Sequence, residues 1–318
     1  MRIFRHYTEF PSAVRGGVVA LGNFDGVHPG HQTVIGTALA MARQRGMPSG
    51  VMTFEPHPRA VFKPDLAPFR LTPFRIKARL IEALGPDFLL MQHFDLAFAR
   101  HSASEFVEQV LVAGLGVSNV VVGYDYVFGH DRGGNVEVLC RMAVAHGFDV
   151  TCIGPVSAGD GAVYSSTNIR TALVTGRPRD AARLLGHDWE IEGRVEHGDQ
   201  RGRTIGFPTA NIELGEYLHP AVGVYAVRAG VDKGGATQWL PGVANFGRRP
   251  TFDKTDVLFE VHLFGFSGDL YGRHLRVALV DYLRGEKKFS GIDALRAQIE
   301  EDCRAARRCM ASARHPDE

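Results

Sequence analysis

The sequence predicts a mixed α/β protein with two domains. Residues 1–185 are expected to form a parallel β-sheet covered by helices, and residues 186–318 a small antiparallel β-barrel with a terminal helix. The first half alternates short apolar runs with helical patterns, which is typical of a parallel sheet. Near Gly186 the pattern changes to short β runs separated by glycines. A chain of 318 residues is also long enough for two separate cores.

Apolar runs in the first domain have the length and composition of buried strands at residues 18–21, 50–54, 87–91, 119–123 and 148–153. Between them, apolar residues recur at helical spacing over about 29–45, 73–84, 103–113 and 136–146. Ligands of open parallel sheets bind beyond the carboxyl ends of the strands. Residues 22–31, 53–58 and 123–134 all follow strands, so we expect these motifs to meet at one crevice.

The second domain begins with a glycine-rich segment and continues with short runs of β composition, such as 223–228 and 257–264. A helical pattern then starts near Ile292, and a short helix at 179–185 joins the two halves. A small barrel followed by one helix is therefore the predicted architecture.

The composition limits which classes of binding partner and which cell compartment are expected. Lys+Arg 36 against Asp+Glu 35 gives a net charge of +1, which argues against a nucleic-acid or membrane surface and favours small molecules. The four cysteines lack metal-ligand spacing, so no zinc site is expected. We expect them to be free thiols in a reducing compartment. There is no signal-peptide pattern and no run of ~20 apolar residues, so we expect a cytoplasmic protein. The oligomeric state is left open.

Two histidines stand three residues apart where the strand at 18–21 gives way to a helix that Pro29 opens. His28 and His31 would flank a helix N-terminus, where free N–H groups attract phosphate. The segment lacks the P-loop lysine and the G-x-G-x-x-G spacing, but matches the H-x-G-H signature of nucleotidyltransferases. The alternative is that both histidines cap a surface helix. The ordered strand, glycine turn and Asp25 favour the functional interpretation.

Residues 193–211 are rich in glycine and polar residues. Gly193, Gly198, Gly202 and Arg203 could form a phosphate cradle for a nucleotide, because small residues let backbone N–H groups approach an anion. Thr209 and Asn211 are two apart on an extended segment, so their side chains share a face and could hold Mg²⁺ bound to ATP. Two glycine turns with a solvated arginine tip explain the segment equally well.

A carboxylate, Glu260, lies inside the apolar run 257–264. Period 2 places Glu260 and His262 on one face, where a partnered carboxylate could act as general base on a hydroxyl. The alternative is an outward-facing Glu–His pair on a half-exposed strand. Strand periodicity alone favours that alternative.

Together these residues resemble the bacterial bifunctional riboflavin kinase/FMN adenylyltransferase family, also called FAD synthetases. The matching blocks run from residue 22 to about 302: 22–32 (GNFDGVHPGHQ), 53–58 (TFEPHP), 122–134 (VGYDYVFGHDRGG), 165–170 (SSTNIR), 202–211 (GRTIGFPTAN), 223–226 (GVYA), 242–252 (GVANFGRRPTF), 270–272 (LYG) and 288–295 (KFSGIDAL). The resemblance implies a nucleotidyltransferase-type, Rossmann-like domain followed by a riboflavin-kinase barrel. It also implies that riboflavin and ATP give FMN, and that FMN and ATP give FAD and pyrophosphate, with Mg²⁺ in both reactions.

By motif match, the resemblance implies a role for each matching residue. His28 and His31 would stabilise adenylyl transfer, and Glu260 would be the kinase base, which reverses the preference from periodicity. The implied nucleotide-binding residues of the first domain are Gly22, Asn23, Phe24, Asp25, Ser166, Thr167 and Arg170. The implied flavin-binding residues are His57, Pro58, Phe62, Asp125 and Phe128. Thr209 and Asn211 match the Mg-ATP positions.

Three aromatic residues, Tyr126, Tyr164 and Phe246, depart from the family pattern, which bears on flavin affinity rather than on the reaction.

Three other functions are alternatives to that of a bifunctional enzyme. One half could have lost its chemistry, or the chain could bind flavin or nucleotide as a regulator without turnover; the intact catalytic positions argue against both. A sister adenylyl- or cytidylyltransferase with a non-flavin acceptor would lack the 202–211 block.

Overall fold

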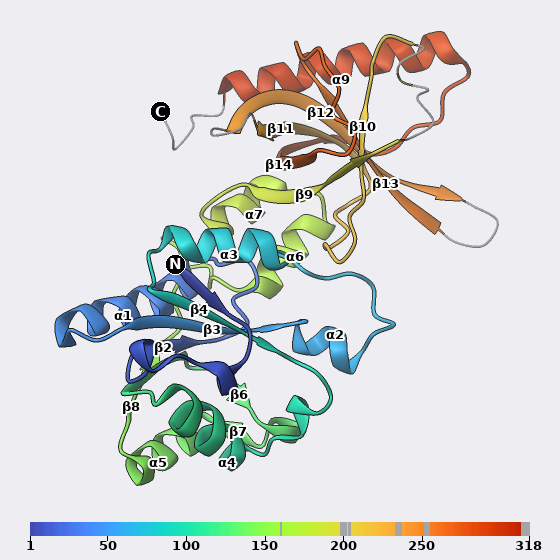
Figure 1. The fold of residues 1–318 in the computed structure, drawn as a ribbon. Coiled ribbons are helices and arrows are strands. Elements are labelled where there is room, and N and C mark those ends of the chain that lie inside the picture. The colour runs from blue at the N-terminus through green and yellow to red at the C-terminus, as the bar shows by residue number, and fades with distance from the viewer. Residues whose placement is uncertain (160, 198–201, 203–204, 233–236, 251–254, 313–318) are drawn as a thin grey trace. The chain divides into compact units, whose positions relative to one another are not determined.

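The computed structural model describes the chain except residues 160, 198–201, 203–204, 233–236, 251–254 and 313–318 (Figure 1). Two compact units form, one from residues 1–67 and 72–165 and the other from 68–71 and 166–318. We expected domains of 1–185 and 186–318, and where the functional boundary lies stays a prediction. Each unit has a hydrophobic core of its own.

The first unit is built on a six-stranded parallel sheet, which confirms the predicted class. The strand order is β1-β4-β3-β2-β5-β8, with bounds Arg2–Phe4, Phe88–His93, Ser49–Glu55, Val18–Leu21, Asn119–Gly123 and Asp149–Ile153. Sequence patterns missed β1, which is too short to show a period. The direction in which strands are added reverses at β2. Strands β3 and β4 are added on one side of β2, and β5 then pairs on its other side. The turn after β2 therefore lies at the switch point, where ligands of such sheets bind.

Helices cover both faces of this sheet. Helix α1 (Pro29–Arg45) and α3 (Phe74–Ala83) pack against the face that carries Val18 and Ala20 of β2. Helices η4 (Phe106–Leu115) and α5 (Val136–His146) pack against the other face. The remaining elements are α2 (Pro58–Phe62), α4 (Ala103–Glu105), β6 (Val127–Phe128), β7 (Gly134–Asn135), η1 (Tyr7–Glu9), η2 (Ser12–Val14), η3 (Phe98–Arg100) and η5 (His130–Arg132). The helix predicted at 103–113 is α4 continued by the π-helical η4.

The second unit is built around a closed six-stranded antiparallel barrel, as predicted. The order around the barrel is β10-β13-β12-β11-β14-β9, with bounds Ala210–Ile212, Thr255–Leu263, Thr237–Pro250, Gly223–Asp232, His274–Arg284 and Trp189–Glu196. The ring closes because β9 pairs with both β10 and β14. Closure satisfies the backbone groups that an open sheet would expose at its edges.

Alternation along the barrel strands separates an interior from an outer face. Trp189, Tyr225 and Phe259 are at most 1% exposed and fill the interior. Neighbours such as Val224 and Val243 face outward and pack against residues of α9 (Ile292–Ser312). Helix α9 lies against β11, β12 and β14 (Figure 1). Polar residues on the part of this outer face that α9 leaves open form one of the two sites below.

Two helices that precede the barrel in sequence belong to its unit: α6 (Ser166–Val174) and α7 (Pro178–Leu185). Helix α7 packs on β9 and β14 and buries Leu184 and Leu185. Arg179 Nη2 adds an ion pair with Asp281 Oδ2 at 2.8 Å. All four cysteines are free. Among the described residues, no helix has both the length and the apolar character that crossing a membrane requires.

Candidate active sites

The turn between β2 and α1 has an unusual backbone. Phe24 and Val27 have φ of 47° and 44°, and Gly26 has φ 98°. Left-handed conformations cost non-glycine residues of order 1–3 kcal/mol each, and Val27 is β-branched. Gly22 is also required, because a Cβ there would lie 2.9 Å from the Phe24 ring. Strain that the surrounding structure holds in place is typical of functional turns.

The two histidines lie together at the start of α1, as predicted. Their rings stack with centroids 3.6 Å apart, and the Phe24 ring meets His31 edge-on at 5.4 Å. His28 is the N-cap residue, since its Nδ1 accepts a hydrogen bond from the backbone N–H of His31 at 3.4 Å. The capping alternative is therefore correct for His28. It is not a surface residue, however, because only 5% of it is exposed.

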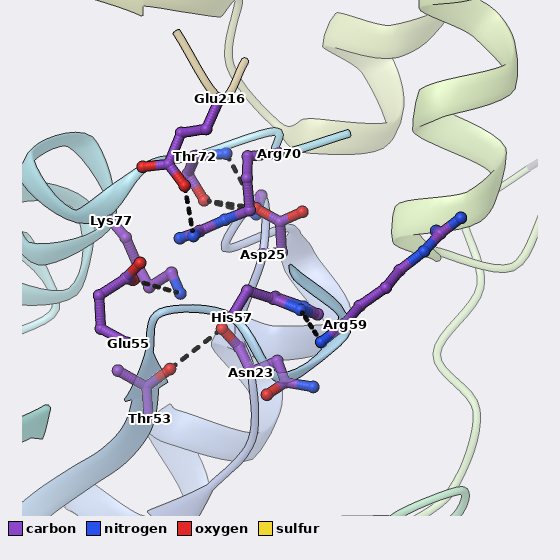
Figure 2. Close-up of polar contacts among 11 residues, drawn as sticks. Asn23, Asp25, Thr53, Glu55, His57, Arg59, Arg70, Thr72, Lys77 and Glu216 are labelled. Atoms are coloured by element: carbon purple, nitrogen blue, oxygen red, sulfur yellow. Dashed lines mark hydrogen bonds and ion pairs between the residues drawn. The ribbon is translucent and has the colours of Figure 1, made fainter. Parts of the chain in front are cut away.

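Buried polar contacts hold the turn in shape (Figure 2). Asp25 Oδ1 accepts hydrogen bonds from the backbone N–H and the hydroxyl of Thr72 at 2.9 and 3.3 Å. The Thr72 hydroxyl in turn accepts from the N–H of Gly26 at 2.8 Å. Thr53, at the end of β3, donates its hydroxyl to the carbonyl of Asn23 at 3.1 Å. The ends of β2 and β3 are thus joined, as the sequence predicted for motifs that share a crevice.

The residues expected to bind flavin follow β3 and β5. His57 caps α2 by accepting from the N–H of Arg59 at 3.1 Å (Figure 2), and Pro58 is the first residue of that helix. Phe62 is 58% exposed, which leaves an aromatic face for a flat ring. Asp125 is exposed, whereas Phe128 packs in the core against Phe106. Whether these residues touch flavin stays a prediction.

Sequence reasoning missed Lys77, a buried lysine next to this region. Lys77 is fully buried on α3, and its Nζ lies 3.8 Å from Glu55 Oε2 at the end of β3 (Figure 2). A buried ammonium has to be paired, so this ion pair fixes the start of the 55–58 segment. The sequence signal was weak, because Lys77 looks like an ordinary surface lysine of an amphipathic helix.

Tyr126 has a buried hydroxyl that makes no hydrogen bond with any described residue. Its ring stacks on Phe128 with centroids 5.7 Å apart. Burial raises the pKa of the phenol well above its ordinary value of 10.0, because the charged form would lose its solvation. The hydroxyl therefore costs stability at this position.

Ser166, Thr167 and Arg170 lie on α6. Helix α6 belongs to the second compact unit and the histidines belong to the first, so their meeting at one nucleotide stays a prediction. Arg170 Nε donates to the carbonyl of Phe69 at 2.8 Å, and its guanidinium lies 5.7 Å from the centre of the Phe69 ring.

Three polar residues form a row across neighbouring strands of the barrel. Asn211 on β10 pairs directly with Glu260 on β13, which pairs with Asn245 on β12. Residues that pair directly in an antiparallel sheet point to the same face, so the three side chains lie side by side on the outer face. Asn245 was missed, because only the pairing of β12 with β13 places it beside Glu260.

The Asn211 and Thr209 positions suit a hard cation. The side-chain oxygen of Asn211 is buried and accepts no hydrogen bond from the described residues, although a buried amide oxygen normally has a partner. Thr209 precedes it by two residues and adds a hydroxyl. Oxygen ligands of this kind are those that Mg²⁺ prefers. The described part of the chain holds no group of three or more His, Cys, Asp or Glu that could bind a metal on its own.

A cavity of about 630 Å³ opens beside Thr209. Its lining residues are Val195, Pro208, Thr209, Ala210, Val261, Leu263, Phe266, Ser267, Gly268, Asp269, Leu270 and Tyr271. Such a volume is within the range of small-molecule sites. At the rim of this cavity, His262 Nδ1 lies 2.8 Å from the carbonyl of Pro208. His262 therefore helps to fix the segment that carries Thr209.

The predicted phosphate cradle is described only in part. Gly198 and Arg203 lie outside the described residues. Gly202 closes a turn, since its carbonyl accepts from the N–H groups of Ile205 and Phe207 at 3.2 and 2.8 Å. A Cβ at Gly193 would lie 2.5 Å from Ile212 Cγ2, so the close approach of β9 to β10 requires this glycine. Nucleotide contacts of these glycines stay predictions.

Comparisons with known proteins agree with this two-site organisation. Residues 10–168 match a family model described as FAD synthetase, and residues 185–310 match one described as riboflavin kinase. The fold and these two matches place the chain among two-domain transferases that act on flavin and nucleotide. The chain belongs to the bifunctional riboflavin kinase/FMN adenylyltransferase family.

Individual relatives support that membership. The bifunctional riboflavin kinase/FMN adenylyltransferase of Escherichia coli strain K12 is 42% identical over 308 residues, which are 96% of this chain and 97% of the relative. The protein of the same name from Pseudomonas fluorescens is 42% identical over 99% of this chain and 100% of its own length. A crystal structure described as a macrolide-efflux protein from Streptococcus pneumoniae is 32% identical, with a TM-score of 0.83 over 96% of this chain and 98% of that one.

Proposed function

We propose that this chain makes FAD in two steps that are divided between its domains. Residues 186–318 transfer the γ-phosphate of ATP to riboflavin, giving FMN and ADP. Residues 1–185 transfer the adenylyl group of a second ATP to FMN, giving FAD and pyrophosphate. The main support is that each compact unit holds a candidate site of its own: the stacked histidines at the start of α1 and the paired Asn211 and Glu260 on the barrel. Family membership argues against a sister transferase with another acceptor.

In adenylyl transfer, a phosphate oxygen of FMN attacks the α-phosphorus of ATP, and the bond to the pyrophosphate oxygen breaks. Negative charge builds on the oxygens around that phosphorus. His28 and His31 donate N–H groups to these oxygens, and the free N–H groups at the start of α1 add their positive potential. The proposed ATP contacts are Gly22, Asn23, Phe24, Asp25, Ser166, Thr167 and Arg170, and the proposed flavin contacts are His57, Pro58, Phe62, Asp125 and Phe128.

In the kinase reaction, the terminal ribityl hydroxyl of riboflavin attacks the γ-phosphorus, and the bond to the β-phosphate oxygen breaks. Glu260 accepts the proton of that hydroxyl as general base. Thr209 and Asn211 would hold Mg²⁺, which would neutralise part of the phosphate charge when bound. The cavity beside Thr209 would take the nucleotide, with Gly193, Gly198, Gly202 and Arg203 near its phosphates.

The substrates are ATP, riboflavin and FMN, and we include Mg²⁺ as the metal of both reactions. We also place the protein in the cytoplasm. All four of its cysteines are free, and Cys140 and Cys152 are exposed, which suits a reducing compartment.

Chromatography of the flavins formed from riboflavin, ATP and Mg²⁺ tests the proposal. The wild-type chain is expected to give FMN and then FAD. His28→Ala should accumulate FMN and lower FAD formation by about 10²–10³, since one charge-stabilising donor is lost. Glu260→Gln should lower FMN formation by about 10²–10⁴ and leave FAD synthesis from supplied FMN unchanged. Each variant is the control for the other. A variant that loses both reactions, or one that keeps both, would contradict the assignment of one reaction to each domain.

A further inference from the structure

A four-residue segment, Pro68–Leu71, belongs to the second compact unit although the residues on both sides of it belong to the first. We call this segment the strap. Arg170 Nε donates to the carbonyl of Phe69 at 2.8 Å, and Trp189 Nε1 donates to the carbonyl of Leu71 at 2.8 Å. Between them, Arg70 donates its N–H to the carbonyl of Glu216 at 3.2 Å and accepts from the N–H of Leu218 at 2.8 Å. Residues 69–71 are thus all bonded to the second unit.

The side chains of the strap are buried as well. The Arg70 side chain is only 1% exposed, and its Nη1 lies 2.9 Å from Glu216 Oε2 (Figure 2). Leu71 is fully buried. A buried guanidinium depends on its carboxylate partner, so Glu216 helps to determine where the strap lies. The strap is therefore an integral part of the second unit rather than a loose connection.

The next residue, Thr72, is bonded within the first unit. Its N–H and hydroxyl both donate to Asp25 Oδ1, and its hydroxyl accepts from the N–H of Gly26. Thr72 and Asp25 are 1% and 2% exposed, so water cannot replace these bonds. Thr72 therefore helps to hold the strained turn that leads to His28, and a single peptide bond joins Thr72 to the strap.

We propose that Thr72 is a positioning residue for adenylyl transfer, and that the strap makes this reaction depend on how the second unit holds residues 69–71. The inference rests on the proposed function of the histidine site. Consecutive Cα atoms are held ~3.8 Å apart, so a shift of Leu71 is passed to Thr72 and from there to Asp25 and Gly26. A misplacement of ~1 Å at a catalytic site can cost about 10²-fold in rate. Arg170, a predicted ATP contact, is bonded to the other end of the strap.

The positioning role is tested by a pair of variants at Thr72 in the full-length chain. Thr72→Val keeps the shape and the backbone N–H bond to Asp25, but it loses the hydroxyl that donates to Asp25 and accepts from Gly26. It should lower kcat for FAD synthesis roughly 10–100-fold. Thr72→Ser restores the hydroxyl and should return kcat to within about threefold of wild type. The KM for FMN and the riboflavin kinase rate should be unchanged in both variants. Loss of folded protein, in contrast, would lower the rates of both reactions. Wild-type FAD synthesis by Thr72→Val would overturn this role.

The coupling is tested from the other side of the strap. Glu216→Ala removes the carboxylate that lies 2.9 Å from Arg70 Nη1, and the rate of riboflavin phosphorylation reports whether the second unit still folds. FAD synthesis should fall roughly 2–30-fold while riboflavin phosphorylation is unchanged. Glu213→Ala, a matched change at an exposed glutamate of the same segment, should alter neither reaction. Equal FAD synthesis by Glu216→Ala and Glu213→Ala would overturn the coupling. The His28→Ala variant, assayed in parallel, reports separately on the proposed function.

Discussion

Replacing Asn211 by leucine is expected to stabilise the barrel unit and to abolish riboflavin phosphorylation. The side-chain oxygen of Asn211 is buried and accepts no hydrogen bond from the described residues. An unpaired buried polar group costs about 1–3 kcal/mol, whereas an apolar group of similar shape costs nothing there. Asn211 is only half-buried as a whole, so we take the lower value, about 1 kcal/mol. For a unit of this size, that corresponds to roughly 2–4 °C in Tm.

The same substitution should remove the response of the barrel to its ligand. Saturation at 100 times Kd stabilises a folded protein by about 2.7 kcal/mol, which is roughly 5–10 °C here. The wild-type chain should show this shift with Mg-ATP, and Asn211→Leu should not. Such opposite changes in stability and function are typical of a polar residue that serves binding rather than folding.

Tryptophan fluorescence makes the measurement specific. The two tryptophans of the chain, Trp189 and Trp239, both lie on barrel strands, so thermal unfolding followed by their emission reports on the second unit within the full-length protein. FAD synthesis from supplied FMN serves as the control and should be unchanged. A lower Tm without ligand, or an undiminished Mg-ATP shift in Asn211→Leu, would refute the assignment of this oxygen to the metal.

Three further predictions concern stability. Tyr126→Phe removes a buried hydroxyl without a described partner and should add about 1 kcal/mol to the free energy of unfolding, while Tyr124→Phe, at a ring that is 53% exposed, should change little. Burial raises the pKa of Tyr126 and of Tyr225 above 10.0, so the folded state keeps protons that the unfolded chain loses: stability should fall as pH rises above about 10, and less steeply in Tyr126→Phe. A fragment of residues 166–318 should be more stable to urea than one of 186–318, which lacks α6 and α7 and with them the buried Leu184 and Leu185. Equal urea midpoints would contradict the packing of these helices on the barrel.

Local patterns in the sequence determined the elements and the chemistry-bearing turns. Periodicity gave five of the six parallel strands and the helix at 29–45, because buried strands and amphipathic helices carry repeating apolar residues. Pro29 marked the start of α1 and Gly46 its end, since each residue has a backbone preference that acts locally. The proximity of His28 and His31 followed from the same local rule.

Contacts between segments far apart in the chain required the tertiary structure. Periodicity favoured an outward-facing Glu260 and was correct about the face, but only the pairing of β10, β13 and β12 shows that Asn211 and Asn245 flank it there. The strap could not be predicted, because Pro68–Leu71 is held by Arg170, Trp189 and residues 216–218, about 100 to 150 positions later. Sequence patterns record the preferences of each residue for its neighbours in the chain. Which distant side chain satisfies a buried carboxylate, amide or guanidinium is decided by packing, because only the folded chain removes water from both partners at once.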